Sequence, residues 1–127
     1  GSQEIAAWAN RCYIMTPHQK RRFPEKVEFM TSAGFIDGKT ARAERGLRGG
    51  GMLAVVTDIG ILEPDDSGEM ILTALHTGRT AEEAKANTGW DLKAASSLKT
   101  TEQVTKKELR ILREELDPTG LYLKSAA

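Results

Sequence analysis

The chain has 127 residues, and eighteen lysines and arginines balance eighteen aspartates and glutamates, so its formal net charge is zero. This length fits one domain over residues 1–127, and the charge balance leaves no net field to attract nucleic acid or an anionic membrane. The single cysteine allows no disulfide within the chain, and no apolar run reaches membrane-spanning length. With no signal segment at the start, we expect a cytoplasmic protein without a nucleic-acid or membrane partner.

A helix followed by a strand is predicted at the start. Ile5, Trp8 and Ala9 recur at spacings that place them on one helical face. Residues 12–16, CYIMT, form a short apolar run that Pro17 stops. Such a run is typical of a strand buried on both faces.

A second, short helix is predicted over residues 23–30. Phe23, Val27 and Met30 recur there at spacings of four and three, as on one side of a helix. The stretch 34–51 holds six glycines among several charges, so it should be irregular or only partly helical.

The middle of the chain predicts an antiparallel β-hairpin. Residues 54–62 and 69–76 are rich in β-branched and apolar side chains. They flank the sequence PDDSG at 64–68, whose proline, aspartates and glycine favour a turn.

Two capping boxes predict the remaining helices. Thr80 with Glu83 begins a helix over about residues 81–87, and Thr105 with Glu108 begins the last one. Helices, a strand and a hairpin together predict a single domain of the α/β or α+β class.

The triple glycine Gly49, Gly50 and Gly51 is one candidate binding element. Glycines let a backbone approach an anion closely, so this stretch could contact a phosphate. It lacks the lysine and hydroxyl residue of a P-loop and the spacing of a dinucleotide-binding turn. The alternative is a tight loop that leads into the hairpin strand.

The densest positive run, His18, Lys20, Arg21 and Arg22, is a second candidate. It could bind a carboxylate or phosphate, form salt bridges within the protein or with a partner, or simply be a solvated face.

The sequence gives little indication of a metal site or of a catalytic nucleophile. His18 and His76 are far apart in the sequence and lack nearby ligand-type residues, so we expect no metal site. Cys12 has no obvious base and is interpreted as a buried structural thiol. Trp8 and Trp90 are interpreted as core anchors, and His76 as a hydrogen-bonded residue at a strand end.

Four segments together resemble a known family. They are TPHQKRRFPEKVEFMTSAGF (16–35), GLRGGGMLAVVTDIGIL (46–62), LTALHTGRTAEEAKANTGWDL (72–92) and ELRILREELDPTGLYL (108–123). Their order and spacing are similar to the C-terminal part of a family I CoA-transferase β subunit of the glutaconate or 3-oxoacid type. The resemblance implies the C-terminal portion of a CoA-transferase-like α/β fold, with a β-hairpin and flanking helices.

The family resemblance also implies a reaction and its participants. Such enzymes move CoA between an acyl-CoA and a carboxylic acid through a glutamyl-CoA thioester, with coenzyme A as substrate and no covalently bound cofactor. Gly1 and Ser2 would fall at the end of a glycine-rich turn that approaches the thioester, although they could equally be a cloning remnant. None of Glu4, Glu25 or Glu28 matches the family nucleophile, so no catalytic residue is assigned and the chain alone is expected to be inactive.

Three hypotheses for the function follow. In the first, the chain needs a CoA-transferase α subunit and a missing N-terminal half. In the second, it is a non-catalytic domain that self-associates as a homo-oligomer or binds a partner through exposed sheet edge and apolar surface. In the third, it acts with an α partner as a CoA-thioester hydrolase or ring-cleaving subunit. Ala33, Met52 and Thr77 stand where the family usually has proline, which is compatible with drift or with ordinary variation.

Overall fold

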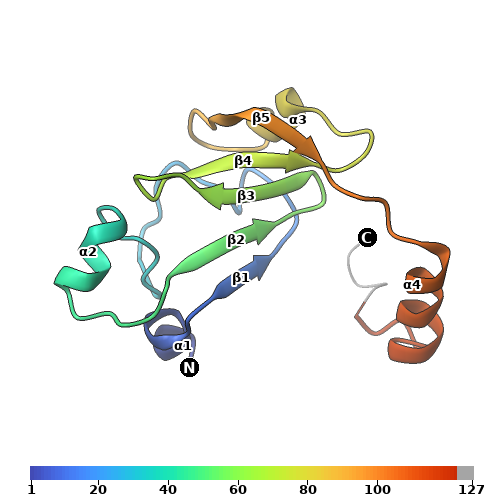
Figure 1. Ribbon diagram of the computed structural model, residues 1–127, viewed down its shortest axis with the longest axis horizontal. Coiled ribbons are helices and arrows are strands. Elements are labelled where there is room, and N and C mark those ends of the chain that lie inside the picture. Colours follow the sequence, from blue (N-terminus) through green and yellow to red (C-terminus); the bar gives the residue numbers. More distant parts are fainter. Residues whose placement is uncertain (123–127) are drawn as a thin grey trace.

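The computed structural model describes residues 1–122, which form a five-stranded mixed sheet with short helices around it (Figure 1). In chain order the elements are α1 (Ser2–Trp8), β1 (Cys12–Met15), α2 (Lys39–Glu44), β2 (Met52–Val56), β3 (Gly60–Pro64), β4 (Met70–Leu75), α3 (Ala81–Ala86), β5 (Ala94–Thr100), α4 (Lys106–Arg110) and the π-helical segment η1 (Ile111–Leu116). The alternation of helices and strands confirms the predicted α/β class.

The strands lie side by side in the order in which they occur in the chain. β2, β3 and β4 form an antiparallel meander, whereas β1 pairs parallel with β2 and β5 pairs parallel with β4. Parallel neighbours need a crossover connection. The segment containing α2 makes the first crossover and the segment containing α3 makes the second, so a parallel strand occupies each edge of the sheet.

The predicted hairpin is confirmed in β3 and β4. The Asp65 carboxylate accepts hydrogen bonds from the backbone N–H groups of Ser67, Gly68 and Glu69 at 2.8 to 3.0 Å. Gly68 has a φ of 97°, which glycine adopts at little cost. Local turn chemistry therefore sets this connection, as expected from the sequence.

The single strand predicted over residues 54–62 is wrong. Thr57 divides it, because the Thr57 hydroxyl oxygen accepts hydrogen bonds from the N–H groups of Ile59 and Gly60 at 3.2 and 3.0 Å. The Thr57 N–H in turn donates to the Gly60 carbonyl at 2.9 Å. This tight turn converts one long strand into β2 and β3.

The helix predicted over residues 23–30 is also wrong. Phe23 is buried, but Val27 and Met30 are exposed, so their helical spacing does not mark a packed face. The Gly89 N–H donates to the Phe23 carbonyl at 2.7 Å, and a Cβ at Gly89 would lie 2.8 Å from that oxygen. A backbone contact with a distant residue thus fixes the start of this irregular segment.

The predicted N-terminal helix and strand exist as α1 and β1, but β1 is not buried on both faces. Cys12 is half-buried, and Tyr13, Ile14 and Met15 are exposed. β1 lies at the edge of the described sheet, where one side of the strand has no neighbour.

Both predicted helix starts exist, although only one capping box is complete. Thr105 and Glu108 make both reciprocal hydrogen bonds and begin α4. The Thr80 hydroxyl accepts from the Glu83 N–H at 3.1 Å, but the Glu83 carboxylate pairs with Arg79 at 2.6 Å instead. β5 was not predicted at all, since it lacks an apolar pattern.

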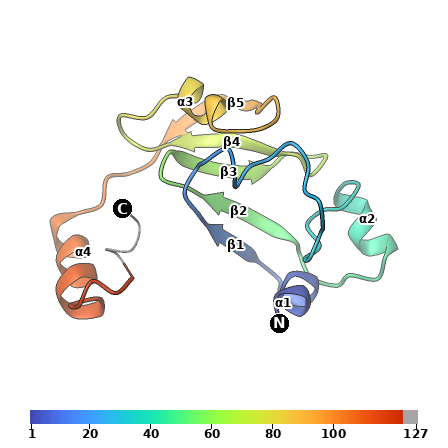
Figure 2. The same ribbon diagram turned by 180° about the vertical axis from the view of Figure 1, so that it is seen from behind.

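The core lies on one face of the sheet, between the strands, α3 and the segment after β1. It is made of Phe23, Ile59, Leu62, Leu72, Ala84 and Leu92. Figure 2 shows the segment after β1 crossing this face, while α4 stands away from the sheet in both views.

Candidate functional site

Arg42 is the most connected charged residue of the first half of the chain. α2 carries it, and its side chain is buried, with 3% of the residue exposed. Its guanidinium donates to the carbonyls of Gly34 at 2.7 Å, Ala6 at 2.9 Å and Gly49 at 3.2 Å, with longer bonds to the neighbouring Ala7 and Ala33 carbonyls. Among residues 1–122, no carboxylate forms an ion pair with it. Arg42 therefore joins α1, the loop before α2 and the triple glycine through backbone oxygens alone.

The triple glycine packs against the end of α1. The Gly49 N–H donates to the Ala7 carbonyl at 2.8 Å and the Gly50 N–H to the Ala9 carbonyl at 3.1 Å. A Cβ at Gly50 would lie 2.2 Å from the Asn10 carbonyl oxygen, and one at Gly49 would lie 2.6 Å from the Ala7 oxygen. The N–H groups of these two glycines are thus used inside the protein, which favours the tight-loop interpretation over an anion cradle.

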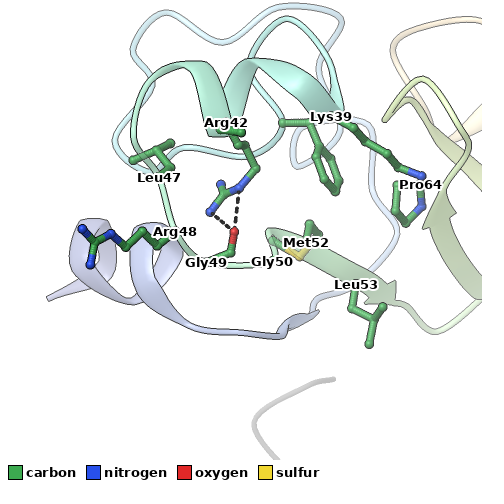
Figure 3. Close-up of a pocket in the computed structure, with 11 residues that line it drawn as sticks. Lys39, Arg42, Leu47, Arg48, Gly49, Gly50, Met52, Leu53 and Pro64 are labelled. Carbon is green, nitrogen blue, oxygen red and sulfur yellow. Dashed lines mark hydrogen bonds between the residues drawn. The ribbon is translucent and has the colours of Figure 1, made fainter.

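A pocket of about 450 Å³ lies between α2, this loop and the start of β2 (Figure 3). Its apolar walls include Phe35, Leu47 and Met52, and its charged lining is entirely cationic, from Lys39, Arg42 and Arg48. The cations do not converge: Lys39 extends toward Pro64, and the Arg48 guanidinium lies 5.9 Å from the centroid of the Trp8 ring. The pocket therefore has positive character without a preformed anion-binding geometry.

Gly1 and Ser2 lie at the opposite end of α1 from the residues that contact the triple glycine. Both are exposed, and the Gly1 amino group pairs with Glu4 at 2.9 Å. The candidate Gly1–Ser2 and the candidate Gly49–Gly51 are therefore separated by the length of one helix.

The predicted basic patch is divided by the structure. His18 is buried and stacks on Phe23, with ring centroids 4.5 Å apart, whereas Lys20, Arg21 and Arg22 are exposed. Arg21 donates to the neighbouring Gln19 side chain at 3.1 Å. Only the three exposed cations remain available as a surface patch.

His18 is a buried connector between distant segments. Its Nδ1 lies 3.2 Å from the Thr57 hydroxyl and its Nε2 lies 2.9 Å from the Thr88 hydroxyl. Burial lowers the pKa of His18 below its ordinary value of 6.5, and the nearby carboxylates of Asp58 and Glu83 oppose this shift only in part. At pH 6.5 and above, the neutral imidazole is therefore the favoured form in the folded protein.

A second pocket, of about 520 Å³, lies where β1 and β2 end. The polar side chains that line it include Thr16, Gln19 and Asp58. The backbone N–H of His18 donates to Asp58 Oδ1 at 2.6 Å, and this hydrogen bond holds the pKa of Asp58 below its ordinary value of 3.8. Ligands of α/β proteins commonly bind at the carboxyl ends of parallel strands, so this position suits a substrate-contacting surface.

None of the glutamates among residues 1–122 is buried. The pKa of Glu4 is lowered by the Gly1 amino group and that of Glu108 by the Thr105 hydroxyl, which is opposite to the shift a general acid needs. This part of the chain also contains no group of three metal-ligating side chains and no helix long and apolar enough to cross a membrane.

The remaining sequence interpretations have mixed outcomes. His76 is hydrogen-bonded at the end of β4, as predicted, through the Thr101 hydroxyl and the Thr57 carbonyl, both at 2.8 Å. Trp90 packs against the core, but Trp8 is exposed, so its assignment as a core anchor is wrong. Cys12 is half-buried rather than buried.

Arg42 and Thr57 are the two residues that sequence reasoning missed. Arg42 lies near Lys39, Glu44 and Arg45, which are all exposed, so no local pattern in the sequence marks Arg42 as the buried one. Thr57 precedes the sequence Asp-Ile-Gly, in which aspartate and glycine could have indicated a turn inside the apolar run.

The chain is similar in sequence to the B subunits of two CoA-transferases and, more distantly, to a hydrolase subunit. No family model matches the chain. The B subunit of the 3-oxoadipate CoA-transferase of Pseudomonas knackmussii is 40% identical over 114 residues, which are 89% of this chain and 44% of that protein. The B subunit of the glutaconate CoA-transferase of Acidaminococcus fermentans is 36% identical over 126 residues, 98% of this chain and 47% of that protein. A more distant relative, at 28% identity over 86% of this chain and 43% of its own length, is the cholesterol ring-cleaving hydrolase IpdB subunit of Rhodococcus jostii.

The crystal structure of the Acidaminococcus fermentans glutaconate CoA-transferase matches this fold with a TM-score of 0.85 and 38% identity, over 96% of this chain and 47% of that one. The chain thus spans slightly less than half the length of the curated relatives it matches. Within that span, both the sequence and the fold agree with the predicted resemblance. The chain is homologous to a part of the B subunit of CoA-transferases.

Proposed function

We propose that this chain is part of a B-type subunit that moves CoA between an acyl-CoA and a carboxylic acid. The similarity to glutaconate CoA-transferase, over 96% of the chain at a TM-score of 0.85, carries this proposal. In the reaction that the resemblance implies, a glutamate attacks the acyl-CoA, and a glutamyl-CoA thioester forms as the donor acid is released. CoA then passes to the acceptor acid, which frees the glutamate.

The chain contributes scaffold and substrate surface, and the nucleophile comes from polypeptide outside these 127 residues. The support for this division is that Glu4, Glu25 and Glu28 are exposed and that none of them matches the family nucleophile. A CoA-transferase α-type subunit and the remainder of a B-type subunit are the partners that complete the site.

The cation-lined pocket is the best candidate surface of this chain for an anionic group of the substrate, either a CoA phosphate or the acid. Lys39 and Arg48 line it, and no carboxylate among residues 1–122 does. In the assembled enzyme, Lys39→Glu should raise the KM for acyl-CoA or for the acid more than tenfold with kcat little changed. Exposed Lys85→Glu is the matched control, and equal effects of both variants would place the anion elsewhere.

The test of the division of labour is a search for the covalent intermediate. The purified chain is incubated with succinyl-CoA and acetate, and CoA exchange is followed by chromatography while protein adducts are followed by mass spectrometry. We expect neither acetyl-CoA nor an adduct. A glutamyl-CoA thioester on any glutamate of this chain would contradict the proposal.

A hydrolase-type activity is the second candidate, favoured by the 28% identity to the ring-cleaving hydrolase subunit. It differs from transfer in the final acceptor, which is water rather than an acid. With the partner subunits present, release of free CoA that does not depend on an acceptor acid would favour this candidate over the transferase.

A further inference from the structure

The outer edge of β1 is apolar and open. Of its residues, Tyr13 is 59% exposed, Ile14 is 43% exposed and Met15 is 83% exposed. Side chains of a strand alternate between the two faces of a sheet, so both faces of this edge are apolar. In both ribbon views no other described element covers this edge (Figures 1 and 2).

The backbone of β1 also has unused pairing capacity. The Cys12 N–H donates to the Gly51 carbonyl and the Thr16 N–H to the Val56 carbonyl, so the even-numbered residues face β2. By the two-residue period of a strand, the N–H and C=O groups of Tyr13 and Met15 point away from the sheet. An edge of this kind is a template for another strand.

The connection into β1 indicates the direction of that strand. α1 leads into β1 through residues 9–11 only, and β1 runs parallel to its neighbour β2. A helix that leads directly into a strand of a parallel sheet is the second half of a β-α-β unit. The first strand of such a unit commonly lies beside the last, parallel to it.

We propose that the outer edge of β1 is the docking site for a parallel strand from the amino-terminal part of a B-type subunit, supplied in the same or a separate polypeptide. This inference rests on the proposed function, because relatives of about twice the length of this chain supply the occupant. The docked strand would pair with Tyr13 and Met15 and cover the side chains of β1, which would then be a central strand.

A second copy of the chain is a poorer occupant. A two-fold axis would pair β1 antiparallel with itself, and so would not supply the parallel strand that a β-α-β unit places before the helix. It would also leave the exposed apolar side chains of α1, Ile5 and Trp8, without the strand that should precede that helix.

The experiment co-expresses this chain with a tagged probe: the part of the B subunit of Acidaminococcus fermentans glutaconate CoA-transferase that precedes the region matched by this chain. Co-purification measures binding, and residue-resolved amide exchange locates it. We expect the Tyr13 and Met15 amides to exchange at least tenfold more slowly in the complex. The outward-facing Leu98 and Thr100 amides of β5, at the opposite edge, should not change.

Two variants separate the edge contact from folding. Met15→Pro removes an outward-pointing N–H and should reduce co-purification at least tenfold, while Thr100→Pro, its counterpart on β5, should leave it unchanged; circular dichroism of each variant checks the fold. The inference is overturned if the wild-type chain does not bind the probe, if Met15→Pro binds as well as the wild type, or if a homodimer already protects Tyr13 and Met15. A protected β1 in a complex that, with the α-type subunit present, transfers no CoA would refute the proposed function and leave this inference intact.

Discussion

The two edges of the sheet differ in chemistry although each is a strand that pairs parallel with its neighbour. β5 carries Ser96, Ser97 and Lys99 among its exposed residues, whereas β1 exposes Tyr13 and Met15. Polar and charged side chains are the usual protection of a solvent-facing edge, and apolar ones are typical of a strand with neighbours on both sides. The sequence of β5 therefore suits its position at an edge, and the sequence of β1 suits a position inside a larger sheet.

The two edge strands also differ in the contacts that hold them to the rest of the protein. β5 follows the capped helix α3 and pairs with the buried strand β4. β1 depends on a junction of backbone contacts, in which Arg42 and the triple glycine hold the end of α1. Changes at this junction should therefore loosen β1 while leaving β5 in place.

The largest expected effect is that of Arg42→Ala. It removes hydrogen bonds to the buried Gly49 carbonyl and to the half-buried Gly34 and Ala6 carbonyls, and the free energy of unfolding should fall by about 3 kcal/mol in a urea titration. The matched control is Arg45→Ala at the C-terminal cap of α2, because the exposed ion pair of Arg45 with Asp37 should contribute less than about 0.5 kcal/mol. Equal losses of unfolding free energy for the two variants would show that Arg42 does not hold the β1 edge in place.

A somewhat smaller effect is expected for Gly50→Ala. The new methyl group would meet the Asn10 carbonyl oxygen at 2.2 Å, so the loop and the end of α1 must separate. This overpacking should cost about 2 kcal/mol, with faster amide exchange in β1 than in β5. Gly34→Ala is the control because a Cβ there meets no atom within 4 Å, and an effect as large as that of Gly50→Ala would contradict this account.

The smallest expected effect concerns pH, through His18, which joins the end of β1 to the turn after β2 and to Thr88 beyond α3. The folded-state pKa of His18 is lowered, so the unfolded chain binds a proton at higher pH than the folded protein does. The contribution of neutral His18 to stability is then complete above about pH 6.5 and is lost as the pH falls below that value.

Urea titrations from about pH 7.5 to about pH 5 measure this dependence. His18→Gln should reduce the dependence of the unfolding free energy on pH in this range. Asp58 does not contribute there, because its pKa is lowered from 3.8 and both the folded and the unfolded forms are ionised. An unchanged slope in the variant would assign the pH dependence to another group.

Local chemistry explains which elements could be predicted from the sequence. The β3–β4 turn and the helix starts at Thr80 and Thr105 depend on side chains that bond to backbone groups two to four residues away. Such contacts can be read directly from the spacing of residues. The family resemblance likewise rested on four sequence segments that occur in the order and spacing of the family.

Distant contacts explain what the sequence did not reveal. Gly89 contacts the backbone at the start of the segment 23–30, and β5 pairs with β4 as a parallel partner. Burial of Arg42 depends on carbonyls from α1 and two loops, which no local pattern indicates. The apolar run of β1 predicted a strand covered on both sides, which is the state we propose for it in a complete subunit.

The most direct test of the central claim is the activity of a chimera. This chain replaces the matching region in the B subunit of Acidaminococcus fermentans glutaconate CoA-transferase, and the chimera is co-expressed with the partner subunit of that enzyme. CoA transfer from an acyl-CoA to an acceptor acid is then measured against the 127-residue chain alone. The account predicts transfer by the assembled chimera and none by the chain alone; a chimera that assembles with its partner subunit yet transfers no CoA would contradict it.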